Sequence, residues 1–296
     1  MRESPSPPDP EQVLRRLEWG VVRPLDGLLH GDCRTLFRGC GLDLADLREY
    51  REGDDVRRID WNVTARLDTP YVREYHQDRD VAAWFLLDLS ASIDFGARMK
   101  KQALSTGFVT VLARLLTRHG NRVGALVYGN GVETVIPARA GRRHVLHLLH
   151  RIMQRPERRA QATKLDELLA GACQFLKRRS AVFVVSDFIS EPGWERPLAE
   201  LARRHDVVAV HVHDPLESEL PDLGMITVED PETGEQLFVD THDRGFRRRF
   251  AEIAAKQAAQ LRKSFAHARV DVLALSTDEP LLGAIARFAA LRKRKS

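Results

Sequence analysis

The chain has 296 residues, 43% of them apolar and 30% charged, which is the composition of a globular protein long enough to bury a core. The formal net charge is only +4, so the chain lacks the large excess of positive charge that is typical of a dedicated nucleic-acid-binding protein. Three cysteines exclude a disulfide framework and favour a reducing compartment.

The first residues are rich in proline and serine and lack the apolar core of a signal peptide. We therefore expect residues 1–12 to form a disordered leader and the protein to be cytoplasmic. No apolar run approaches the roughly 18–20 residues that a membrane helix needs, so no membrane span is expected.

Residues 13–80 form a segment of dense mixed charge that begins with a predicted short helix over residues 13–19. Apolar and polar residues alternate over residues 58–66 and again over residues 71–77, with a turn signal between the two runs. This period of two predicts an N-terminal β-hairpin made of those runs.

Residues 81–291 alternate between apolar runs of strand length and stretches of helical periodicity. Strands are predicted over residues 81–87, 122–128, 132–137, 181–186, 207–212 and 270–275. Helices are predicted over residues 99–117, 141–154, 163–177, 197–205, 246–265 and 280–291. The alternation predicts an α/β fold, a doubly wound, mostly parallel and Rossmann-like sheet, followed by a basic tail at residues 292–296.

Hard oxygen donors follow the buried strands of this predicted sheet. Asp88, Ser90 and Ser92 come directly after the first buried strand. Asp187 follows a later buried strand, and Thr163 stands at the start of the helix before that strand. Such folds bind ligands beyond the carboxyl ends of their strands, and Mg²⁺ prefers oxygen ligands. The sequence therefore predicts one Mg²⁺ or Mn²⁺ site made of these five residues.

Helix and turn capping is the alternative explanation for the same residues. Ser and Asp after a strand often cap the next helix. Thr163 could be the N-cap of its helix, with Asp166 in a capping-box position, and Asp187 could cap a turn. Capping explains each residue singly, whereas their coincidence at consistent strand ends favours the metal site.

The series Asp-x-Ser-x-Ser, then Thr, then Asp resembles the metal-ion-dependent adhesion site of von Willebrand factor A domains. The resemblance implies that the hydroxyls of Ser90, Ser92 and Thr163 contact the metal directly, and that Asp88 and Asp187 often act through water. It further implies one coordination position left for an acidic group of a partner. The expected function is then a non-enzymatic, metal-dependent protein-binding module without catalytic residues.

The run of residues 48–66, REYREGDDVRRIDWNVTAR, is similar to the signature of the bacterial domain of unknown function family 58. Residues 37–41 and 70–75 fit its flanks, and residues 42–44 and Ile93 depart from it without touching a predicted ligand. The resemblance covers residue 34 to the C-terminus. It implies a von Willebrand A domain often encoded beside a MoxR-type AAA+ ATPase, so the expected partner is that ATPase or its substrate, with an exposed acidic residue.

The same signature is rich in closely spaced Arg and Asp. Arg57, Asp60 and Arg66 could form ion pairs that lock this segment onto the α/β domain, with Trp61 and Tyr75 as apolar anchors. The alternative is that the segment contacts a partner.

Two other functions remain open at this stage. A metal-dependent hydrolase would need a base near the metal-bound water, and the sequence offers none beyond the predicted ligands. Nucleic-acid binding could use the basic stretch of residues 139–164 and the tail, but no aromatic residues are interleaved with those charges. The basic stretch is explained either as a solvated basic face or as a charged rim that steers acidic partners toward the metal. His211 and His213 could hold zinc, but no further ligands at suitable spacing are evident.

Overall fold

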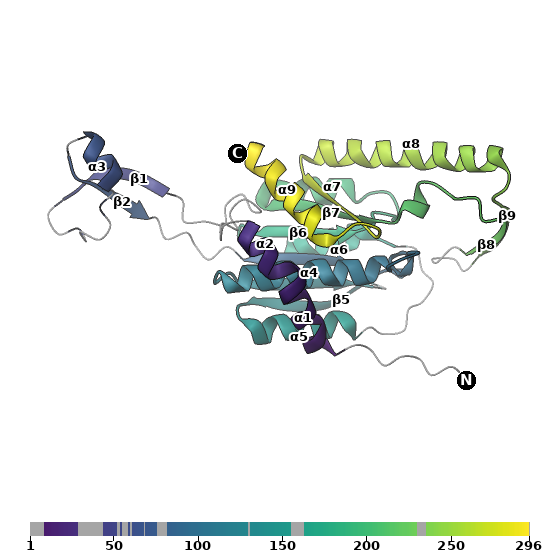
Figure 1. The fold of residues 1–296 in the computed structure, drawn as a ribbon, viewed down its shortest axis with the longest axis horizontal. Coiled ribbons are helices and arrows are strands. Elements are labelled where there is room, and N and C mark those ends of the chain that lie inside the picture. Colours follow the sequence, from purple (N-terminus) through teal and green to yellow (C-terminus); the bar gives the residue numbers. More distant parts are fainter. Residues whose placement is uncertain are drawn as a thin grey trace.

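The computed structural model describes residues 9–28, 44–51, 54, 59, 61–67, 69–75, 82–129, 131–154, 163–229 and 235–295. Its centre is a six-stranded sheet in the order β10-β7-β6-β3-β4-β5 (Figure 1). These strands are β3 (Ala83–Asp88), β4 (Val123–Tyr128), β5 (Val132–Arg139), β6 (Ala181–Ser186), β7 (Asp206–His213) and β10 (Asp271–Ser276). Every pairing is parallel except that of β4 with β5. The predicted α/β fold with a mostly parallel sheet is confirmed.

Helices cover both faces of the sheet, and this explains why its central strands are buried along their whole length. All six residues of β3, β4 and β6 are buried. Within β3, Phe85 and Leu87 join one apolar core, whereas Trp84 and Leu86 join the other, as a period of two requires. The first core lies under α1 (Pro10–Leu17), α4 (Lys101–Arg118), α5 (Arg142–Met153) and α9 (Leu281–Lys295). The second lies under α6 (Leu165–Phe175), α7 (Glu195–Arg204) and α8 (Arg244–Ala268).

The N-terminal helices belong to the first core. After α1 the chain continues through a π-helix, η1 (Glu18–Val22), into α2 (Arg23–Leu28), and Leu14 is fully buried. Helix α1 starts inside the predicted leader because the Asp9 side chain accepts a hydrogen bond from the Glu11 amide and caps it. The predicted disordered leader is therefore wrong for residues 9–12, and residues 1–8 lie outside the described part of the chain.

The predicted hairpin of residues 58–66 with 71–77 is wrong. β2 (Tyr71–Tyr75) pairs along its length with β1 (Leu44–Glu49), and α3 (Trp61–Leu67) is a helix, so that an isolated antiparallel bridge between Ile59 and Val72 is what the described residues show of the predicted pairing. A short apolar run does not distinguish a strand from a helix, and here the Thr64 hydroxyl accepts a hydrogen bond from the Tyr71 amide across the turn. Together β1 and β2 form a two-stranded sheet of their own.

The predicted polar lock falls partly outside what the structure describes. Arg57, Asp60 and the side chain of Tyr75 lie outside the described residues. The Arg66 side chain is exposed, and Trp61 is 68% exposed, so Trp61 is not the apolar anchor that the sequence predicted.

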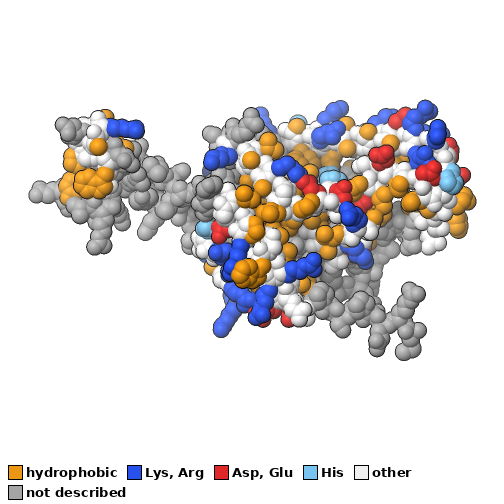
Figure 2. Space-filling model, in the orientation of Figure 1, with side chains coloured by type: hydrophobic (Ala, Val, Ile, Leu, Met, Phe, Trp, Pro, Cys, Tyr) orange, Lys and Arg blue, Asp and Glu red, His pale blue; other side chains and the backbone are white. Residues whose placement is uncertain are grey.

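A second two-stranded ribbon, β8 (Met225–Glu229) with β9 (Gln236–Asp240), was not predicted. It projects at the right-hand end of Figure 1, next to the start of α8. Met225, Leu237 and Phe238 are all exposed, and Figure 2 shows apolar side chains gathered at that end.

The predicted basic tail is also partly wrong, because α9 runs to Lys295. Arg292 is buried, and its guanidinium contacts Asp206 at 2.7 Å and Asp271 at 2.9 Å, at the starts of β7 and β10. No helix in the described ranges is both long enough and apolar enough to cross a membrane.

Candidate metal centre

The five predicted ligands lie at the carboxyl edge of the sheet and are all buried. Asp88 ends β3, and Asp187 directly follows β6, the neighbouring parallel strand. The Thr163 carbonyl accepts hydrogen bonds from the Ser190 hydroxyl and the Glu191 amide, both at 2.9 Å. Thr163 is thereby held against the loop that follows Asp187.

The two serines face each other. Their hydroxyl oxygens are 3.2 Å apart, and the Ser90 amide donates to Oδ1 of Asp88 at 3.0 Å. Ser90 immediately precedes the 3-10 helix η4 (Ala91–Asp94), but its side chain makes no capping hydrogen bond there. The capping interpretation is therefore wrong for Ser90.

Thr163 does not cap α6 either. The N-cap position belongs to Lys164, which makes no side-chain capping bond. The amide of Leu165 donates instead to the Ser190 hydroxyl at 2.9 Å. The predicted capping box of Thr163 with Asp166 is therefore wrong, because the loop after β6 supplies the hydroxyl that satisfies this helix start.

Asp88 is fully buried and is held from both sides. Its Oδ2 accepts a hydrogen bond from the Ser186 hydroxyl at 2.6 Å. Burial, and then the negative charge of Asp187, raise the pKa of Asp88 to about 6. A cation in this place would relieve that repulsion.

Asp187 combines the role of a turn cap with that of an ion-pair partner. Its Oδ1 accepts from the Ile189 amide at 3.1 Å, so the alternative that it caps a turn is correct. Its Oδ2 accepts from Nζ of Lys101 at 2.6 Å, and the same Nζ donates to Oε1 of Glu217, also at 2.6 Å. Sequence reasoning missed Lys101, Glu217 and Ser186 as members of this cluster.

The residues present fit a hard divalent cation. Neighbouring oxygens around an octahedral Mg²⁺ with bonds of about 2.1 Å lie about 3 Å apart. The 3.2 Å between the hydroxyls of Ser90 and Ser92 matches such an edge. Lys101 pairs with two carboxylates, those of Asp187 and Glu217, and the buried Asp88 adds negative charge beside Asp187, so negative charge is left for a cation.

In the described part of the chain, clusters made only of His, Cys, Asp or Glu give no competing metal site. The rings of His211 and His213 stack with their centroids 5.2 Å apart. Among the residues that the structure describes, no three side chains of those four types are arranged so that they could hold a metal ion by themselves. The zinc alternative therefore gains no support, whereas the predicted site depends on hydroxyls as well as carboxylates.

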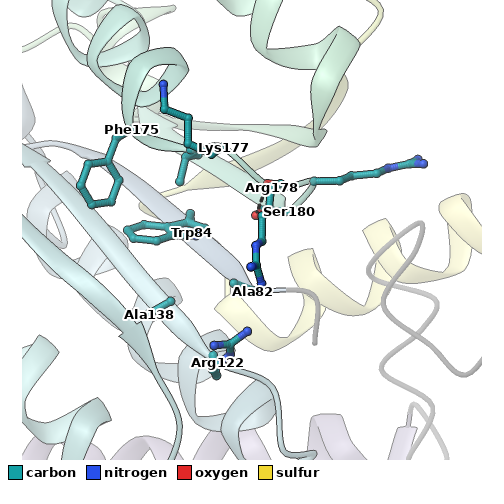
Figure 3. A pocket seen from close by; sticks show the side chains of 10 residues that line it. Ala82, Trp84, Arg122, Ala138, Phe175, Lys177, Arg178 and Ser180 are labelled. Carbon is teal, nitrogen blue, oxygen red and sulfur yellow. Dashed lines mark hydrogen bonds between the residues drawn. The ribbon is translucent and has the colours of Figure 1, made fainter. Parts of the chain in front are cut away.

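A separate cavity of about 300 Å³ lies at the opposite, amino edge of the sheet (Figure 3). The rings of Trp84 and Phe175 meet edge to face in its wall, with centroids 5.4 Å apart. Arg122 and Arg178 line it as well, and none of its described lining residues is acidic. This cavity is therefore not an alternative site for a cation.

Comparison with known proteins places the chain in a family. Uncharacterized proteins of Mycobacterium bovis and Mycobacterium tuberculosis are each 38% identical over 290 residues, which is 95% of this chain and 89% of theirs. A conserved hypothetical protein, BatB from Bacteroides thetaiotaomicron, is 15% identical over 72% of this chain and 99% of its own, with a TM-score of 0.46. An aerotolerance-related membrane protein from Bacteroides fragilis is 12% identical over 73% of this chain and 100% of its own, with a TM-score of 0.45. Residues 46–260 match the model described as "Protein of unknown function DUF58", and the chain belongs to that family.

Proposed function

We propose that this protein is a metal-dependent protein-binding module in which Mg²⁺ or Mn²⁺ is held by Asp88, Ser90, Ser92, Thr163 and Asp187. The observation that carries the proposal is the serine pair, with hydroxyls 3.2 Å apart beside two buried carboxylates. When bound, the cation supplies a coordination position for an acidic group of a partner. The protein's own residues fix that position, because each of the two aspartates is also held by a backbone amide.

The charges around the site favour an acidic partner. Hydroxyl ligands are neutral and leave a bound cation much of its charge. Helix α5 adds positive charge, although Arg142 is partly neutralised by Glu11 at 3.0 Å. Arg151, near the end of α5, is exposed and can attract an acidic surface from a distance, whereas Arg142 and Arg143 stand at the start of α5, where the His144 ring contacts the Val123 carbonyl at the amino edge of the sheet.

The ribbon of β8 and β9 offers apolar contact area to such a partner. Phe238 is 76% exposed and Met225 is 73% exposed, and exposed apolar patches often mark interaction surfaces. The ribbon lies at the end of the molecule where α8 begins (Figure 1).

The hydrolase alternative receives no comparable support. His211 is the candidate general base near the site. Burial, and then the proximity of His213, lower its pKa to about 4. A general base works best when its pKa lies near the working pH. The proposal is accordingly a binding protein without enzymatic activity.

We assign the partner from the family resemblance and from charge. A MoxR-type AAA+ ATPase, or a substrate of that ATPase, would present an exposed Asp or Glu to the site. The protein would then act as an adaptor or assembly factor for the ATPase.

A pull-down with the full-length chain tests this function. The candidate ATPase from the same genome should bind in Mg²⁺ and not in EDTA, and either Thr163→Ala or the double change Ser90→Ala with Ser92→Ala should abolish binding. Ser105→Ala is the matched control, because this buried serine bonds only the Lys101 carbonyl within α4. Binding that is indifferent both to EDTA and to Thr163→Ala would sink the proposal.

A further inference from the structure

Lys101 is a buried cation beside the candidate metal centre. It is the first residue of α4, and its side chain is fully buried. Its Nζ lies 2.6 Å from Asp187 and 2.6 Å from Glu217. Burial opposes the charge, but the two carboxylates outweigh burial and raise the pKa of Lys101, so the ammonium persists at neutral pH.

Glu217 is itself fixed by the chain around it. It ends the 3-10 helix η5 (Pro215–Glu217), and its Oε2 accepts from the Asp214 amide at 3.0 Å in a capping box. Asp214 accepts from the Thr277 hydroxyl at 2.5 Å and from the Ala97 amide at 3.2 Å. Glu217, which shares Lys101 with Asp187, is therefore held by Asp214, and Asp214 is held in turn by contacts from two other segments.

We propose that Lys101 sets the cation affinity of the centre, by occupying Asp187 when no divalent cation is present and by opposing the charge of one that binds. This inference rests on the proposed function and specifies how that site is regulated. The ammonium repels an incoming divalent cation, because like charges at close range in a protein interior interact strongly. Glu217 acts in the opposite sense, because its carboxylate offsets part of the ammonium charge.

The consequence is a site that is weak for the cation alone and better completed by a partner. With Lys101 on Asp187, a bound cation is less fully neutralised by the protein. An acidic side chain from outside therefore gains more by binding it. Metal binding and partner binding would then be coupled, each strengthening the other.

Two substitutions that remove opposite charges distinguish this role from simple packing. Lys101→Met removes the ammonium and should tighten Mn²⁺ binding at least tenfold. Glu217→Gln removes the offsetting carboxylate and should weaken Mn²⁺ binding several-fold. Damage to the structure would weaken Mn²⁺ binding in both variants. The proposal instead predicts that Mn²⁺ affinity rises in one variant and falls in the other.

Calorimetric titration of the full-length chain with Mn²⁺ measures both effects. Lys100→Met is the control, since this neighbouring lysine is exposed.

Lys101→Met can lower stability, so thermal melts with and without Mn²⁺ accompany the titration. Mn²⁺ should raise the melting temperature of that variant more than that of the wild type. Unchanged or weaker binding by Lys101→Met, with wild-type binding intact, overturns the role of Lys101. If Lys101→Met binds Mn²⁺ and the wild type does not, the role of Lys101 is supported and a metal site in the native protein is contradicted. If neither protein binds Mn²⁺, both the role of Lys101 and the metal site are refuted.

Discussion

The hydroxyl of Ser186 lies 2.6 Å from Oδ2 of Asp88 and joins the end of β6 to the end of β3. The same hydroxyl accepts a hydrogen bond from the Phe188 amide at 2.8 Å. Phe188 has a φ of 58°, in the left-handed region that costs energy for any residue other than glycine. One buried hydroxyl therefore fixes Asp88 and also supports the strained turn that presents Asp187.

Replacing Ser186 with alanine should damage both stability and metal binding. The change leaves a buried carboxylate oxygen and a buried amide without their partner, at a cost of about 1–3 kcal/mol. Urea denaturation should show this loss, and titration with Mn²⁺ should show weaker binding. Ser105→Ala serves as the comparison because it removes a hydroxyl bonded only within α4, and equal effects from the two variants would contradict the role given to Ser186.

The buried ion pairs of Arg292 should matter far more than an exposed pair on the same helix. Arg292→Met leaves Asp206 and Asp271 without their shared guanidinium, and breaking a buried pair costs about 3–5 kcal/mol. Arg287, which pairs with Glu279 at the exposed surface, is the control, and Arg287→Met should change stability little. Similar denaturation curves for the two variants would mean that residue 292 behaves as the solvated tail that the sequence suggested.

His211 should make the metal-free protein less stable as the pH falls from about 6.5 to about 4. Burial, and then His213, lower its pKa in the folded state to about 4, whereas the unfolded state titrates near 6.5. Between these values the unfolded state binds more protons, so stability rises with pH and is lost as the pH falls.

The contribution of His211 is isolated by comparing the wild type with His211→Gln in EDTA. The raised pKa of Asp88 acts in the opposite sense but is present in both proteins. Over this pH range the wild type should lose stability relative to the variant, on the order of 2–3 kcal/mol at pH 4. A difference between the two proteins that stays constant with pH would show that His211 titrates normally.

The fold was largely predictable because its core strands carry strong local signals. Residues 181–186 were predicted as a strand with the same bounds as β6, since a continuous apolar run between polar turns suits a strand covered on both faces. The strand prediction around Trp61 was wrong because seven residues of mixed apolar and polar pattern fit a helix as well as a strand. The prediction that Arg292 belongs to a basic tail was wrong because its acidic partners, Asp206 and Asp271, are far away in the sequence.

The candidate site was predictable only where its residues form a pattern within a short stretch of sequence. Asp88, Ser90 and Ser92 form a motif within one loop, and Asp187 follows a recognisable strand. Lys101 stands beside Lys100 at the start of α4 and looks like a surface residue, and its partners are 86 and 116 residues away. The series Asp214-Pro215-Leu216-Glu217 could have indicated a capping box, but not the contact with Lys101.

The most direct test of the central claim is the anomalous scattering of Mn²⁺ in crystals of the full-length protein. We predict one strong peak at the carboxyl edge of the sheet, within coordination distance of the hydroxyls of Ser90 and Ser92, and its absence from crystals of the Ser90→Ala, Ser92→Ala variant. A wild-type crystal with no peak between these serines, or with Mn²⁺ bound only elsewhere, would contradict the account.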